Sequence, residues 1–210
     1  MWVSLRIDHV IYAVEDLDVA GGRFRADFGL GSIAGGRHPH WGTANRIVPL
    51  GRDYVELVTV VDRDVAAASD FGRPVLDAIA KGQPLVGWAA RTDDLQAIAN
   101  RLGLEVQRGS RTRPDGSVLA WQLAGVAPGL AGGALPFFIE WDVPPELHPG
   151  AADAGHDVSP VGIASIEVTG DKHSLHEWLG ESQLPLRIVE GAPSLSAVAI
   201  GTATGDLLLR

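Results

Sequence analysis

A pattern of one strand, one helix and three strands occurs twice in this chain and begins a third time. The elements of the first copy are expected at 6–14, 16–28, 31–35, 43–50 and 54–61. Those of the second copy are expected at 85–91, 93–102, 105–111, 118–123 and 136–143. A repeat of this length indicates a supersecondary module that is too small to bury its own apolar face, so the copies must pack together.

Two pairs of short sequences align the copies. Val14-Glu15-Asp16-Leu17 matches Thr92-Asp93-Asp94-Leu95 at the start of each helix, and Tyr54-Val55-Glu56-Leu57 matches Phe138-Ile139-Glu140-Trp141 in each last strand. The alignment predicts that Glu56 and Glu140 occupy equivalent strands, and that Gly87 stands where the first copy has His9.

The repeat predicts an α+β protein in which β-α-β-β-β modules form a cup-shaped, cavity-bearing sheet, with a partial third module. The expected organisation is a first module, a linking helix, a second module, a linker and a third, C-terminal module, at 1–62, 63–82, 83–143, 144–160 and 161–210.

Charge and composition exclude several classes of protein. The 17 Lys and Arg against 26 Asp and Glu give a formal net charge of −9, so we expect neither a nucleic-acid partner nor an anionic membrane surface. Cysteine is absent, which leaves His, Asp and Glu as the strong metal ligands. No segment resembles a signal peptide or a membrane span, so the sequence predicts a cytoplasmic protein.

Six short motifs lie in the two modules: Arg6-Ile7-Asp8-His9-Val10, Gly35-Gly36-Arg37-His38-Pro39, Gly42-Thr43-Ala44-Asn45, Tyr54-Val55-Glu56-Leu57, Arg111-Thr112-Arg113-Pro114-Asp115-Gly116 and Phe137-Phe138-Ile139-Glu140-Trp141. With these motifs in this order, the sequence resembles the glyoxalase-like domain proteins of the vicinal-oxygen-chelate superfamily. That superfamily also contains glyoxalase I, extradiol dioxygenases and bleomycin-resistance proteins. The resemblance implies a cup-shaped barrel around a cavity, but such a fold hosts isomerases, oxygenases and simple binders.

The resemblance also implies one divalent metal ion, whose ligands come from the first and the last strand of each module. Carried onto this sequence, the ligand positions are His9, Glu56 and Glu140, while the fourth falls on Gly87, which cannot ligate. One imidazole with two carboxylates suits Mn²⁺, Zn²⁺, Fe²⁺ or Mg²⁺. The alternative is a metal-free polar cavity floor in which an arginine neutralises the carboxylates.

Two further groups of residues are candidates for substrate binding. His38, His40 and Asn45 lie around one loop, and the two histidines would face the same way on an extended segment. Arg111 and Arg113 would also share one strand face and suit a carboxylate or phosphate. Solvated loop histidines, and arginines paired with a cavity glutamate, are the alternatives.

The leading hypothesis is a divalent-metal-dependent enzyme, of lyase, isomerase or dioxygenase type, that acts on a small, oxygen-rich, anionic organic substrate. Glu56 and Glu140 would be its catalytic carboxylates. The alternative is a metal-free small-molecule binding or sequestering protein of the bleomycin-resistance type. The partners that the sequence admits are a small-molecule ligand and a second copy of the chain in a homodimer.

Overall fold

The computed structural model describes residues 4–112 and 118–210. Its first module consists of β1 (Leu5–Ala13), α1 (Leu17–Phe28), β2 (Ile33–His38), β3 (Thr43–Pro49) and β4 (Tyr54–Val60). Asp16 begins α1 by accepting hydrogen bonds from the backbone N–H groups of Asp18 and Val19, and Gly29 ends it in the left-handed conformation at φ 68°.

Two short helices, α2 (Arg63–Ala68) and α3 (Gly72–Lys81), connect the modules within the expected linking segment, 63–82. The elements of the second module are β5 (Leu85–Thr92), α4 (Leu95–Leu102), β6 (Val106–Thr112), β7 (Val118–Ala124), α5 (Val126–Leu130) and β8 (Phe137–Trp141). The chain then forms the short 3₁₀ helices η1 (Pro145–Leu147) and η2 (Pro149–Ala151), followed by β9 (Pro160–Thr169), α6 (Lys172–Leu179), β10 (Leu186–Val189), β11 (Ser194–Thr202) and β12 (Leu207–Leu209).

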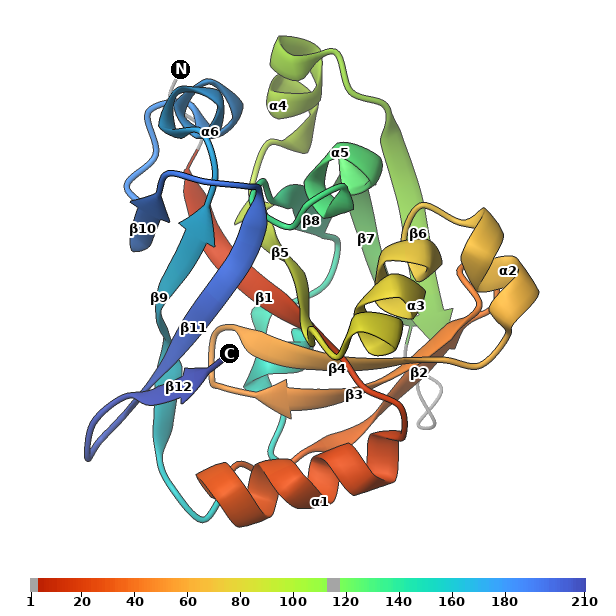
Figure 1. Cartoon of the computed structure of the whole chain (residues 1–210), viewed down its shortest axis with the longest axis vertical. Helices are drawn as coiled ribbons and strands as arrows, with labels where there is room; N and C mark the ends of the chain where they lie inside the picture. The colour runs from red at the N-terminus through yellow and green to blue at the C-terminus, as the bar shows by residue number, and fades with distance from the viewer. Residues whose placement is uncertain (1–3, 113–117) are drawn as a thin grey trace.

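The first two modules build one eight-stranded sheet in the order β2-β3-β4-β1-β5-β8-β7-β6. β1 pairs in parallel with β4, β5 pairs in parallel with β8, and β1 joins β5 in antiparallel fashion. The two halves therefore repeat the same strand order outward from their junction, and the α+β, cup-shaped fold with repeated modules is confirmed. Figure 1 shows the curved sheet from β2 to β6.

The C-terminal unit has the same order of elements as the modules but a different strand order. Its sheet runs β10-β9-β11-β12, so its first strand lies between two others. Apolar side chains of this sheet, including Ile166 and Val198, share one buried cluster with Val10, Trp88 and Phe138 of the large sheet. The C-terminal sheet therefore covers the face opposite α3 and α5, and its strands are the blue ones on the left of Figure 1.

No helix in the described part of the chain is long and apolar enough to cross a membrane.

Asp53, just before β4, attaches the large sheet to the C-terminal sheet. Its Oδ1 accepts a hydrogen bond of 2.9 Å from the backbone N–H of Ile163, and its side chain is nearly fully buried. Burial raises the pKa of Asp53 from its ordinary value of 3.8 to about 6, against the lowering effect of the Ile163 hydrogen bond and of Arg52.

Asp53→Asn should change how stability depends on pH. The folded wild type holds a proton on Asp53 up to about pH 6, whereas the unfolded chain loses it near 3.8, so the associated stability is lost as pH rises through 6. Asparagine keeps an acceptor for Ile163 without titrating. We expect the wild type to lose about 2 kcal/mol relative to the variant between about pH 4 and about pH 8, measured by urea unfolding.

Asp70→Asn, at an exposed position, is the control and should show no such difference. The pKa of Asp8 is lowered in the folded protein, so Asp8 makes stability depend on pH in the opposite sense. This contribution is present in all three proteins and cancels when their free energies of unfolding are compared. Parallel stability curves for wild type and Asp53→Asn would contradict the prediction.

Candidate functional site

The concave face of the large sheet encloses a small cavity of about 50 Å³. Its polar lining side chains are His9, His38, Asn45, Tyr54, Glu56 and Arg111. Its aromatic walls are Trp41, Phe71, Trp121, Phe137 and Trp141. Convergent polar groups inside an apolar wall are typical of a small-molecule site, although a ligand of more than a few atoms requires the walls to move.

A β-bulge in β1 brings Asp8 and His9 together. Ile7 pairs with Ala90 and His9 pairs with Ala89, which leaves Asp8 as the extra residue in the strand. Successive side chains of a regular strand point to opposite faces, and a bulge changes that direction. Asp8 Oδ1 consequently lies 2.7 Å from His9 Nδ1.

Asp8 is fully buried and accepts from several donors at once. Besides His9, the ring of His148 contacts Asp8, with 3.0 Å between His148 Nε2 and Asp8 Oδ2. Trp141 Nε1 donates to the same oxygen at 3.1 Å, and Arg91 Nη1 lies 3.7 Å from it. Burial by itself raises the pKa of Asp8, but the hydrogen bonds from His148 and His9 outweigh it and hold the pKa well below its ordinary value.

An ionised Asp8 fixes the tautomer of His9. A carboxylate can only accept, so His9 Nδ1 carries a proton, and in the neutral form of the ring Nε2 carries the lone pair. That Nε2 lies 3.8 Å from Glu56 Oε2, too far for a direct hydrogen bond. Tyr54 stacks on the His9 ring with centroids 4.6 Å apart. The arrangement presents an oriented imidazole beside a carboxylate, both in the lining of the cavity.

Glu56 is held in place from the neighbouring strand. Its Oε1 accepts a hydrogen bond from Asn45 Nδ2, and Asn45 Oδ1 accepts from the backbone N–H of Gly36 at 2.6 Å. A Cβ on Gly35 would lie 1.9 Å from Asn45 Oδ1, so only glycine allows this contact. The second oxygen of Glu56 is thereby left to face His9.

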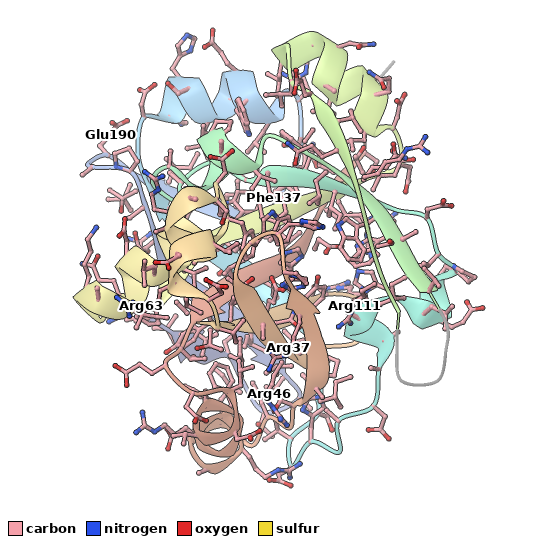
Figure 2. All side chains as sticks on the ribbon, turned by 90° about the vertical axis from the view of Figure 1, so that its right-hand side faces the viewer. Arg37, Arg46, Arg63, Arg111, Phe137 and Glu190 are labelled. Carbon is pink, nitrogen blue, oxygen red and sulfur yellow. The ribbon has the colours of Figure 1, made fainter. Side chains whose placement is uncertain are left out.

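His38 and Arg111 reach the cavity from β2 and β6, the two edges of the sheet. A Cβ on Gly36 would lie 3.0 Å from Arg111 Nη1, so the edges approach each other closely here. Figure 2 views the molecule from the side of these two edges and labels Arg37 and Arg111. Burial lowers the pKa of His38 and Arg111 lowers it further, whereas Glu56 opposes them.

The structure does not bring every expected residue into the cavity. His9, His38, Asn45, Glu56 and Arg111 line it. His40 does not, because β2 ends at His38 and the chain turns, which leaves His40 exposed. The expectation that both histidines face the cavity is therefore wrong for His40. Arg113 lies outside the described residues.

Glu140 lies on the other face of β8, so its expected place among the ligands and catalytic carboxylates is also wrong. Phe137, Ile139 and Trp141 face the cavity, and strand alternation turns Glu140 away from it. Glu140 Oε2 instead accepts a hydrogen bond of 2.8 Å from the backbone N–H of Leu95, at the start of α4.

The strand registers correct the alignment of the modules. His9 pairs with Tyr54 in the first module, and Ala89 pairs with Phe137 in the second. The matching bulges at Asp8 in β1 and Val86 in β5 keep Gly87 as the counterpart of His9. Because Ile11 pairs with Glu56 and Ala89 pairs with Phe137, the counterpart of Glu56 is Phe137, in place of Glu140.

The residues present do not fit the metal site that the superfamily resemblance implies. Of its four positions, one is Gly87, which has no side chain to ligate, and another, Glu140, faces away from the cavity. Within residues 4–112 and 118–210, no three His, Cys, Asp or Glu side chains converge in a way that suits a metal ion. His9 and Glu56 remain as two potential ligands, fewer than a resident divalent ion in a protein site ordinarily has.

Three side chains of the site were not among the expected site residues: Asp8, Tyr54 and His148. Asp8 stands in a quoted motif beside His9, but nothing in the sequence reveals the bulge. His148 belongs to the segment that was expected to be a linker.

Comparison with solved structures identifies the fold. A hypothetical protein from Staphylococcus aureus is similar over 96% of this chain and 92% of its own, with a TM-score of 0.73 and 19% identity. Methylmalonyl-CoA epimerase from Mycobacterium tuberculosis gives a TM-score of 0.46 at 23% identity, over 67% of this chain and 89% of its own. The Streptomyces coelicolor methylmalonyl-CoA epimerase with 2-nitronate-propionyl-CoA gives 0.49 at 20%, over 68% and 100%.

No curated protein matches this chain. Residues 7–183, however, match the family described as the glyoxalase-like domain, Glyoxalase_3. This range includes both modules, the segment that carries His148 and the beginning of the C-terminal unit. The chain therefore belongs to the glyoxalase-like domain family of the vicinal-oxygen-chelate superfamily.

Proposed function

We propose that this protein binds a small, oxygen-rich, anionic organic molecule in its cavity and transfers a proton to or from a carbon of that molecule. The observation that carries the proposal is the hydrogen bond from His9 to the buried Asp8, which directs Nε2 toward Glu56. A general base needs a lone pair aimed at its substrate and a partner that stabilises its charged form, and this pair supplies both.

In the proposed reaction, His9 Nε2 takes a proton from a carbon next to a carbonyl group. The electron pair of the broken C–H bond moves to the carbonyl oxygen and forms an enolate. Asp8 stabilises the resulting imidazolium through Nδ1, as a carboxylate partner does for other catalytic histidines. Return of the proton from His9, or its passage through Glu56 Oε2, completes an isomerisation or an exchange.

Arg111 is the partner proposed for an anionic group. It is a cationic side chain in the cavity lining, which also contains Glu56. A guanidinium forms two parallel hydrogen bonds to a carboxylate or to an enolate beside it, which fixes orientation as well as charge.

The proposal departs from the metal-dependent mechanism in that no step passes through a metal. The reason is the donor set, since Gly87 offers no ligand at one of the positions that the resemblance assigns and Glu140 faces away from the cavity at another. We assign the proton transfer to side chains of this chain instead.

A metal-free binding protein is the second candidate. The aromatic walls favour it, because Trp41 stacks on Phe71 with centroids 4.4 Å apart and Trp121 packs against Trp141 at 5.5 Å. Aromatic surfaces of this kind bind flat organic molecules without catalysing a reaction. Binding would require these walls and Arg111, but not the Asp8–His9 pair.

Hydrogen exchange on candidate ligands separates the two functions. The protein is incubated in D₂O with a panel of 2-oxo and 2-hydroxy carboxylates, and loss of the C–H signal beside the carbonyl is followed by proton NMR. We expect exchange with at least one ligand, slowed about 100-fold or more by His9→Ala and less by Glu56→Gln.

His40→Ala removes an exposed histidine of the same loop region outside the cavity and is the matched control. It should exchange like the wild type. A ligand that binds but shows no exchange above the protein-free rate would favour the binding function.

Arg111→Lys tests how the anion is held. Lysine keeps the charge but cannot form the paired hydrogen bonds of a guanidinium, so we expect the dissociation constant of an anionic ligand to rise about tenfold. The measurement is titration calorimetry or thermal shift with the ligand found above.

Arg108→Lys, at an exposed position of the same strand β6, is the control. Equal affinities in wild type and Arg111→Lys, or stabilisation by neutral compounds alone, would remove Arg111 from the proposed binding site.

A further inference from the structure

The segment between the second module and the C-terminal sheet contributes a second histidine to the buried carboxylate. His148 is only 5% exposed and lies between η1 and η2. Its Nε2 is 3.0 Å from Asp8 Oδ2, and its Nδ1 accepts a hydrogen bond of 3.1 Å from the backbone N–H of Gly150.

These two contacts determine where the His148 proton lies. A backbone N–H only donates, so Nδ1 must be unprotonated, and the proton of the neutral ring is on Nε2. Gly150 is itself held firmly, since its carbonyl accepts from Gly51 and a Cβ on it would lie 2.5 Å from the Asp53 carbonyl oxygen. Backbone geometry therefore makes His148 a donor to Asp8.

The donation divides the two oxygens of Asp8 between their partners. Oδ2 receives His148 and Trp141, which leaves Oδ1 to His9 Nδ1. His148 also packs edge-on against Tyr54, at 5.7 Å between ring centroids, and Tyr54 stacks on His9. Both histidines therefore contact the same tyrosine ring as well as the same carboxylate.

We propose that His148 is a positioning residue that keeps His9 in the tautomer with its proton on Nδ1 and its lone pair toward the cavity. The inference rests on the proposed function for its catalytic meaning, but the tautomer itself is measurable without any ligand. His148 cannot pass a proton outward, because Nδ1 is engaged by Gly150. A proton taken up by His9 therefore leaves through the cavity.

The test is nitrogen-15 NMR of the full chain with labelled histidine, which distinguishes protonated from unprotonated ring nitrogens. In the wild type we expect His9 protonated on Nδ1 and His148 on Nε2. His148→Phe keeps a ring but removes the donor, and we expect a second His9 species, protonated on Nε2, to appear. His148→Gln places an amide N–H near the position of Nε2 and should restore the wild-type pattern.

His156→Phe is the matched control. His156 belongs to the same segment and accepts a hydrogen bond of 3.0 Å from the backbone N–H of Gly31, but it does not contact Asp8. Its loss should leave the His9 signals unchanged.

Where a ligand shows exchange, His148→Phe should lower kcat about tenfold or more with KM within about twofold, and His148→Gln should recover most of the lost kcat.

Each outcome has a definite meaning. An unchanged His9 tautomer in folded His148→Phe overturns the positioning role, even if proton exchange is observed. If His148→Phe does not fold, the test rests on folded His148→Gln. Altered His9 signals in that variant overturn the role of the donor, whereas wild-type signals support it. A wild-type His9 protonated on Nε2 contradicts both this inference and the proposed base. The correct tautomer with no exchange of any ligand contradicts only the proposed function.

Discussion

A carboxylate without access to water lies at the centre of this structure, and its neighbours are arranged to keep it charged. Asp8 reaches its position through a bulge and is compensated by His9, His148 and Trp141, with Arg91 nearby. Removing one partner of a buried charge ordinarily costs about 3–5 kcal/mol, so these contacts are mutually dependent. The orientation of His9, on which the proposed chemistry depends, is a consequence of this arrangement.

The two modules share a fold but have diverged in chemistry. The first provides His9 and Glu56, whereas the corresponding positions of the second are Gly87 and Phe137. A symmetric scaffold thus carries a site whose polar floor comes mainly from one half, and whose aromatic wall comes largely from the other. The segment that leads to the C-terminal sheet completes the site with His148.

The sequence predicted the modules because apolar periodicity and helix caps are local signals, and Asp16 caps α1 as that pattern indicated. The site was harder to predict because it depends on register. Matching Glu56 with Glu140 placed Glu140 three residues from the counterpart given by the register, Phe137, and an odd displacement along a strand reverses the face. Asp8 was missed because strand alternation predicts that its side chain points away from that of His9. His148 was missed because its segment has no regular strand or α-helix to predict.

The central claim is that this site works through oriented side chains rather than a resident divalent ion. Elemental analysis of protein purified without chelator, on the same sample in which proton exchange is assayed, tests it most directly. The account predicts exchange activity with manganese, iron and zinc well below one ion per chain, and equal metal content in wild type and His9→Ala. One ion per chain, lost together with activity in His9→Ala and Glu56→Gln, would contradict it.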